Sequence, residues 1–182
     1  MFKHTSPEAL PAMQAQGNHI KLTTHGDFAR GAMLNLTFAD RLGDGAVRLK
    51  KEGEGVFLTP AIQTEKPFND LVASWNSDTP RGTSVEIYGR AYIPDYDGWS
   101  NGGETYDGWT DWITWGEWSP FIERGCPQDA DSHPSRSGDK NGWAYAYSFG
   151  SAGDSSLNIT DGLTATAFQL KAVVRADGTQ TA

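Results

Sequence analysis

The sequence predicts an all-β fold, an antiparallel β-sandwich of jelly-roll-like form, on three grounds. Short segments in which apolar and polar residues alternate recur along the chain, as in strands that bury one face. The 21 glycines and nine prolines are frequent between these segments, where turns need them. No long segment repeats with the roughly 3.6-residue period of an amphipathic helix. At 182 residues the chain has the length of one large sandwich domain.

The two ends of the chain are predicted to differ from its middle. Residues 1–18 are expected to be a leader or a short helix, ahead of a single β-sandwich domain over residues 19–182. A helix over Ser6–Gln16 is one interpretation, because Ser6 suits the N-cap; an unstructured leader is the other. Residues 176–179 have turn composition directly after a strand. Since such a turn usually introduces a further strand, we expect the chain to be a fragment of a longer protein.

The first strands are predicted where apolar and polar residues alternate. Val47–Lys50 is one such strand, and Val56–Thr59 is a second that follows a turn at Gly53–Gly55. Phe68–Trp75 alternates again. The residues of this last segment that share one face are Leu71, Ala73 and Trp75.

The clearest strand prediction is Ser84–Ile93, because its two faces differ in chemistry. Its apolar face consists of Val85, Ile87, Ala91 and Ile93, and its other face of Glu86, Tyr88, Arg90 and Tyr92. Two later strands follow, each after a long polar loop: Trp143–Phe149, with aromatic residues on one face, and Thr166–Val174. The buried face of the closing strand is predicted to hold Phe168, Leu170, Ala172 and Val174.

Charge and composition exclude several classes of protein. The formal net charge of −8 argues against nucleic acid as a partner, since phosphate binding needs clustered Lys and Arg. No stretch approaches the roughly 20 apolar residues of a transmembrane helix. The single cysteine, Cys126, excludes an internal disulfide. We therefore expect an extracellular or cell-surface domain of bacterial origin, where disulfides are often lacking.

Four tryptophans recur at every third residue, as Trp109, Trp112, Trp115 and Trp118. This spacing fits neither a flat strand nor a helix face, so a bulged strand or two short strands joined at Gly116 is expected. A stacking platform for sugars is one interpretation, and packing in or under the core is the other. The candidate ligand-binding residues, which lie at the loop end of the sandwich, are Trp99, Tyr106, Trp109 and Trp112.

A loop rich in aspartate and glycine precedes the tryptophans. Its carboxylates offer the oxygen ligands that Ca²⁺ prefers, although the spacing is not that of an EF-hand. The candidate metal ligands are Asp95, Asp97 and Asp107. Carboxylates that lie in solvated turns without a bound ion are the alternative. Structural calcium is the only cofactor that the sequence suggests.

Several stretches together resemble a known family. They are GVFLTPAI (Gly55–Ile62), FNDLVASWNSDTPRGTSVEIYGRAY (Phe68–Tyr92), WTDWITWGEWSPF (Trp109–Phe121) and DGLTATAFQLKAVVR (Asp161–Arg175). This arrangement resembles the β-sandwich region that precedes a papain-like cysteine peptidase domain, of the bacteriocin-processing (double-glycine) type, in exported proteins of Gram-positive bacteria. The resemblance covers roughly residues 45–175, apart from loops at 94–108 and 127–141 that look longer.

That resemblance implies a non-catalytic accessory module, with any peptidase activity in a domain C-terminal to this chain. Such a module would bind or position a cell-wall glycan, a peptide or the neighbouring peptidase domain. A self-contained jelly-roll enzyme acting on glycans is an alternative, and a purely structural spacer is another. The enzyme would need a carboxylate pair in a cleft. Its candidates are Glu86, Glu104, Asp111 and Glu117, and nothing in their spacing selects a pair.

Overall fold

The computed structural model describes residues 13–17, 19–40, 44–94, 100–101, 104–105, 108–110, 112–119, 136–139, 142–147, 156–159 and 164–177. These residues form an all-β structure with one short helix, which confirms the predicted fold class. Among them, no helix has the length and apolarity of a membrane span.

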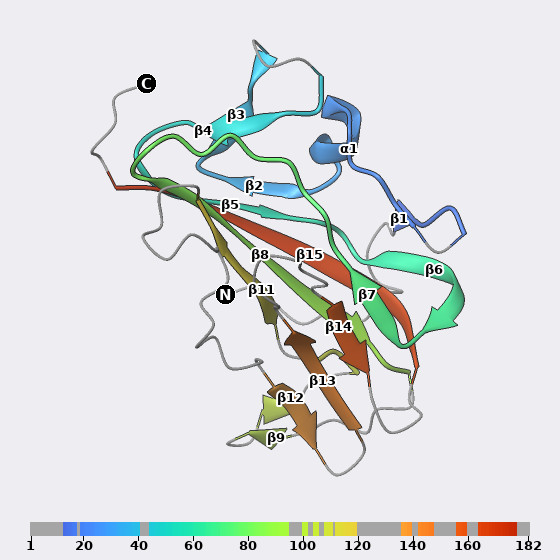
Figure 1. Ribbon diagram of the computed structural model, residues 1–182. Coiled ribbons are helices and arrows are strands. Elements are labelled where there is room, and N and C mark those ends of the chain that lie inside the picture. Colours follow the sequence, from blue (N-terminus) through green and yellow to red (C-terminus); the bar gives the residue numbers. More distant parts are fainter. Residues whose placement is uncertain are drawn as a thin grey trace.

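The larger sheet has seven strands and is built around the last one. Its strands are β1 (Met13–Gln14), β2 (Ala32–Leu34), β5 (Gly53–Leu58), β6 (Ile62–Phe68), β8 (Thr83–Tyr92), β11 (Ile113–Trp118) and β15 (Ala165–Ala176). One edge of β15 pairs with β8, which in turn pairs with β11 (Figure 1). The other edge pairs first with β6 and then with β5. Every pairing in this sheet is antiparallel except that of β1 with β6.

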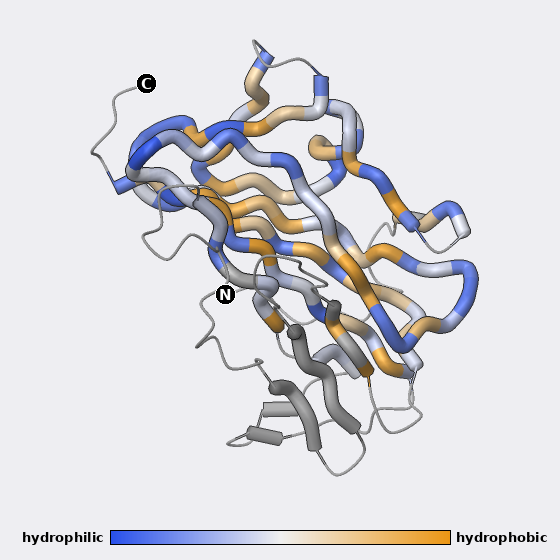
Figure 2. The backbone as a smooth tube through the Cα atoms, in the orientation of Figure 1, coloured by the Kyte–Doolittle hydropathy of each residue, from blue (hydrophilic) through white to orange (hydrophobic). Residues whose placement is uncertain are grey.

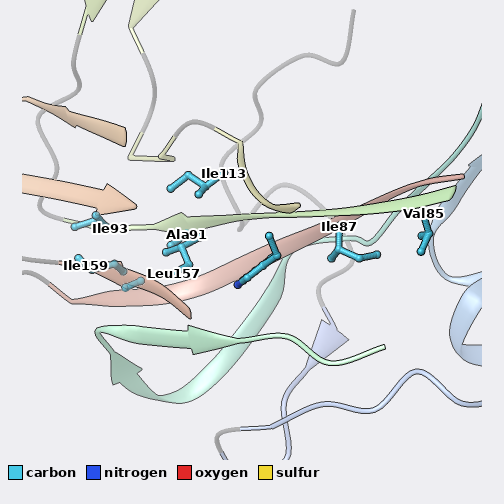
Figure 3. Close-up of a cluster of buried hydrophobic side chains, with 9 residues drawn as sticks. Val85, Ile87, Ala91, Ile93, Ile113, Leu157 and Ile159 are labelled. Atoms are coloured by element: carbon cyan, nitrogen blue, oxygen red, sulfur yellow. The ribbon is translucent and has the colours of Figure 1, made fainter. Parts of the chain in front are cut away.

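The smaller sheet has four strands and packs on the larger one. It has the order β12 (Arg136–Asp139), β13 (Gly142–Tyr147), β14 (Ser156–Ile159) and β7 (Asp70–Val72). Figure 3 shows Leu157 and Ile159 of β14 beside Ala91 and Ile93 of β8. These side chains belong to one buried cluster, so the two sheets form an antiparallel sandwich.

A short helix and a hairpin pack against β5. The helix α1 (His25–Ala29) begins with a capping box between Thr24 and Asp27, and the ring of Phe28 lies 5.0 Å from that of Phe57. The hairpin consists of β3 (Leu36–Phe38) and β4 (Val47–Leu49). Two further short strands, β9 (Ser100–Asn101) and β10 (Glu104–Thr105), pair with each other. The sequence did not predict α1, because five residues are too few to show a helical period.

The N-terminal prediction is wrong from residue 13 onward. Met13 and Ala15 are buried against Ile62 and Phe168, and β1 pairs with β6, so this segment belongs to the sandwich rather than to a leader or helix. An unpaired leader would have no reason to bury these apolar side chains. Residues 1–12 lie outside the described part of the chain.

Most predicted strands are confirmed in position and facing. The strand expected at Ser84–Ile93 is β8, and the one at Thr166–Val174 is β15. In Figure 2 apolar and polar positions alternate along these strands. The turn expected at Gly53–Gly55 is instead the start of β5, and β6 was not predicted, because Glu65, Lys66 and Pro67 hide it. The strand predicted at Trp143–Phe149 corresponds to β13. The side chains of β13 lie outside the described part of the structure, so the predicted aromatic face stays a prediction.

Candidate functional site

Most of the predicted site residues lie outside the described part of the chain. These are Trp99, Tyr106, Asp95, Asp97 and Asp107. The calcium site therefore stays a prediction. Among the residues that the structure does describe, no three His, Cys, Asp or Glu side chains group as a metal site.

A bulge in β11 decides which way the tryptophans face. Thr114 lies opposite Tyr88 and Glu117 opposite Glu86, so three steps along β11 match two along β8. This extra residue is a β-bulge within the tryptophan segment, one of the two arrangements that the sequence predicted. Trp115 is buried in the core between the sheets, whereas Trp112 and Glu117 lie on the opposite face.

The face of the larger sheet that turns away from the smaller sheet is called the outer face here. On β8 it carries the polar set predicted from the alternation in the sequence, and register places the polar residues of β15 beside it. Lys171 is opposite Tyr88, Gln169 is opposite Arg90, and Arg175 is opposite Ser84. The outer-face residues used below are Trp112, Thr114, Glu117, Ser84, Glu86, Tyr88, Arg90, Tyr92, Gln169, Lys171, Arg175 and Glu54.

Along this face, cations alternate with aromatic rings. The Arg90 guanidinium lies 4.5 Å from the ring centre of Trp109 and 4.7 Å from that of Trp112. The Lys171 ammonium lies 4.9 Å from Trp112 and 4.0 Å from Tyr88. We call Trp109, Arg90, Trp112, Lys171 and Tyr88 the cation–aromatic ladder. Each such contact stabilises by about 0.5–2 kcal/mol, more when desolvated.

Buried hydrogen bonds fix the middle of the ladder. The Arg90 Nε donates to Gln169 Oε1 at 2.9 Å, and the Gln169 amide donates to the Thr59 carbonyl at 2.9 Å. Thr59 lies where β15 changes partner from β6 to β5, and its hydroxyl accepts from the Leu170 amide at 2.9 Å. Burial lowers the pKa of Arg90 to about 10, so the guanidinium remains charged at neutral pH. These bonds hold the Arg90 guanidinium in its place between the rings of Trp109 and Trp112.

Beyond the ladder, Arg175 binds three carboxylates. Its Nη1 lies 2.8 Å from Glu86 Oε2 and 3.5 Å from Glu117 Oε1, and its Nε lies 3.3 Å from Glu54 Oε2. The Thr114 hydroxyl donates to Glu86 at 2.9 Å. Since Glu86 and Glu117 are directly opposite in register, their repulsion is offset by the guanidinium that they share.

These contacts shift the pKa values of the cluster. Burial acts to raise the pKa of Glu86, but hydrogen bonds from Tyr88, Arg175 and Thr114 outweigh it and the pKa is lowered. Burial, and then the neighbouring Glu86, raises the pKa of Tyr88 to about 12. Burial acts to lower the pKa of Arg175, and its bonds to Glu86 more than reverse this. The carboxylate and the guanidinium are both held charged at neutral pH.

An open hollow of about 520 Å³ adjoins this cluster. Its polar lining includes Glu54, Ser84, Glu117, Ser119, Arg175 and Asp177. The Ser84 hydroxyl donates to Glu117. Side chains of this kind accept and donate hydrogen bonds in fixed directions, as a hydroxyl-rich ligand requires.

The two tryptophans predicted as ligand-binding differ in exposure. Trp109 is 1% exposed and packs with Ala61, Ala167 and Tyr92. A stacking face needs an accessible ring, so the structure gives Trp109 a packing role, the alternative that the sequence left open. Trp112 is half-buried and its ring is already in contact with two cations.

Of the carboxylates considered for an enzyme, the structure brings together Glu86 and Glu117. Asp111 lies outside the described residues, as does the side chain of Glu104. Sequence reasoning missed Lys171, Arg175 and Gln169. The alternation of the closing strand could have placed them on one face, but their pairing with β8 spans about 80 residues and leaves no local signal.

Comparison of the chain with family models, with curated proteins and with solved structures found no match. The family resemblance of the sequence therefore stays a prediction.

Proposed function

We propose that this chain is a non-catalytic binding module that recognises a glycan through its outer face. The observation that carries the proposal is the cation–aromatic ladder, continued by the Arg175 cluster. Together they form a row of aromatic and charged side chains whose positions are set by hydrogen bonds and ring contacts. Fixed groups lose little conformational freedom on binding, which favours affinity.

A spacer would not need this arrangement. Burying Arg90 and half-burying Glu86 costs desolvation free energy that apolar residues on the same face would not incur. An exposed sheet face stays soluble with simple surface charges. The retention of a built polar network on this face therefore favours recognition over a purely structural role.

A glycan hydrolase is the second candidate, and the carboxylates argue against it. A general acid needs a raised pKa, whereas the pKa of Glu86 is lowered. Glu86 and Glu117 also both contact the guanidinium of Arg175, so neither is arranged as a free acid beside an open site. They are better suited to accept hydrogen bonds from sugar hydroxyls than to deliver a proton.

The wider setting is proposed from the sequence resemblance. It supports a place in an exported bacterial protein, at the cell surface, ahead of a cysteine peptidase domain that the module would position on its substrate. A peptide or that neighbouring domain is then the competing ligand for the same face.

The test is a binding screen followed by a matched pair of variants. The panel holds peptidoglycan fragments and soluble neutral and acidic polysaccharides, each with and without calcium, and the first readout is quenching of tryptophan fluorescence. Binding of any hit is then measured by calorimetry in Trp112→Ala and Trp118→Ala. Trp118 is 37% exposed and lies on the other face of β11, opposite Val85, so it is a control of the same chemistry.

We expect Trp112→Ala to weaken binding and Trp118→Ala to leave it unchanged. The reverse result would place the binding surface on the rim of the inner face. If no compound of the panel binds, the proposal is overturned in favour of a spacer or a docking domain.

A further inference from the structure

Lys171 differs from the other two cations of the outer face in its surroundings. Arg175 is bound by three carboxylates, and Arg90 donates to Gln169. The Lys171 ammonium instead lies between the rings of Tyr88 and Trp112. Within the part of the chain that the structure describes, no carboxylate or other hydrogen-bond acceptor lies within bonding distance of it.

Aromatic rings hold an ammonium in place without satisfying its donors. The attraction is to the ring quadrupole, whereas each of the three N–H groups prefers an oxygen lone pair. Lys171 is half-buried, and burial lowers its pKa, an effect that the charge of Glu86 opposes. The cation is thus positioned and partly desolvated while its donors point to nothing in the described chain.

We propose that Lys171 binds a carboxylate of the ligand, and that the ligand is an acidic oligosaccharide such as one containing uronic acid. This inference rests on the proposed function and names the ligand class of the same face. Ammonium-to-carboxylate bonds are among the stronger hydrogen bonds, and here water is already partly excluded.

The rest of the face limits how many carboxylates the ligand can carry. Arg175 is four residues further along β15, about 13 Å away at the usual rise of a strand. At that end the exposed carboxylates of Glu54 and Glu117 repel a second anion and accept bonds from hydroxyls. A chain in which acidic and neutral sugars alternate fits both ends, whereas a densely acidic peptide or a single acidic sugar does not.

The experiment uses ligand pairs that differ only in the carboxylate. The probes are a hexasaccharide of alternating glucuronic acid and N-acetylglucosamine, the same hexasaccharide with its carboxyls reduced to alcohols, free glucuronic acid and a polyglutamate peptide. Each is titrated by calorimetry into the wild-type chain, Lys171→Gln, Lys171→Arg and the control Lys66→Gln. Lys66 is an exposed lysine in β6.

We expect the wild-type chain to bind the acidic hexasaccharide about tenfold more tightly than its reduced form, as one well-placed charge pair gives. Lys171→Gln should bind both forms alike, with Lys171→Arg and Lys66→Gln keeping the preference. Free glucuronic acid should bind weakly. Thermal melting of each variant shows whether the fold is intact, and Lys171→Arg keeps the test valid if Lys171→Gln is unstable.

Equal binding of both hexasaccharides by the wild-type chain would overturn the inference and leave glycan binding standing, as would hits confined to neutral glycans in the wider panel. Tight, Lys171-dependent binding of polyglutamate alone would replace the glycan with an acidic peptide. If no glycan of either panel binds, the proposed function itself fails.

Discussion

The ring of Trp115 lies directly against Gly89 of the neighbouring strand, with no space for a side chain between them. A Cβ built at Gly89 would overlap the Trp115 indole. Trp115 is fully buried in the core between the sheets, and its backbone adjoins the bulge of β11. The glycine therefore permits the large side chain that anchors β11 to the sandwich.

Gly89→Ala is expected to destabilise the fold by about 1–3 kcal/mol, the usual cost of overpacking a filled core. Urea unfolding measures it. The control is Gly26→Ala in α1, where the new Cβ would meet only the Thr24 hydroxyl at 3.6 Å. Because alanine favours a helix over glycine, this control should be neutral or slightly stabilising. Similar unfolding curves for the two variants would contradict the packing of Trp115 on Gly89.

The cluster around Arg175 predicts a pH dependence of stability. The pKa of Glu86 is lowered in the folded chain from its ordinary value of 4.5. A carboxyl group whose pKa is lower in the folded than in the unfolded chain stabilises the fold at pH values above its unfolded pKa. This contribution to the free energy of unfolding is lost as the pH falls below 4.5 and through the folded pKa. Arg175→Met removes one cause of the shift, so its deficit relative to wild type should be present at neutral pH and shrink in acid.

Urea midpoints of both chains across that pH range test the prediction. Arg48→Met is the control, because Arg48 is exposed and its side chain donates to the carbonyl of its neighbour Leu49 at 3.5 Å. Its difference from wild type should not vary with pH. A constant deficit for Arg175→Met would mean that the guanidinium acts by packing alone.

Sequence reasoning reached one side of the site because alternation is local. The strand Ser84–Ile93 could be predicted, together with the sharing of a face by Glu86, Tyr88 and Arg90. The spacing of the tryptophans also indicated either a bulge or a turn at Gly116. The alternation of one strand does not identify the residues that lie opposite it on the next strand. No residue near Lys171 in the sequence indicates that Lys171 pairs with Tyr88. The ladder is a product of register between distant strands.

The same reasoning explains why the sequence alone did not show that Trp109 is buried. It follows a polar loop, where aromatic residues often serve ligands. The structure instead pairs it with Tyr92 by an isolated bridge, and its ring packs on Ala61 and Ala167 and lies over Arg90. The space for the ring is left by two small residues, Ala61 between β5 and β6 and Ala167 on β15, and no local feature of the sequence indicates them.

Trp109→Ala is accordingly expected to cost about 3–5 kcal/mol of stability, the range for truncating a buried tryptophan. Trp118→Ala should cost much less, since that ring is 37% exposed. Chemical denaturation of both variants makes the comparison. A near-normal midpoint for Trp109→Ala would indicate that the ring is not part of the packed structure and would reopen its role in binding.

Two buried threonines offer a test of hydrogen bonding by the same substitution with opposite outcomes. Thr59 is 1% exposed, and its hydroxyl accepts from the Leu170 amide at 2.9 Å, where β15 changes partner. Thr79 is 6% exposed, and its hydroxyl has no partner within the described chain. Valine matches threonine in shape, so Thr→Val changes chiefly the hydroxyl.

Thr59→Val strands the Leu170 amide in a buried site and should destabilise by about 1–3 kcal/mol. Thr79→Val removes an unsatisfied polar atom and should be neutral or stabilising, since an unbonded buried hydroxyl is unfavourable. Thermal melts of the two variants test both expectations, because the melting temperature should fall for Thr59→Val and stay the same or rise for Thr79→Val. If both lose stability equally, the Thr79 hydroxyl has a hydrogen-bond partner after all; if neither does, the bond at Thr59 contributes nothing to the junction where β5 ends and β6 begins.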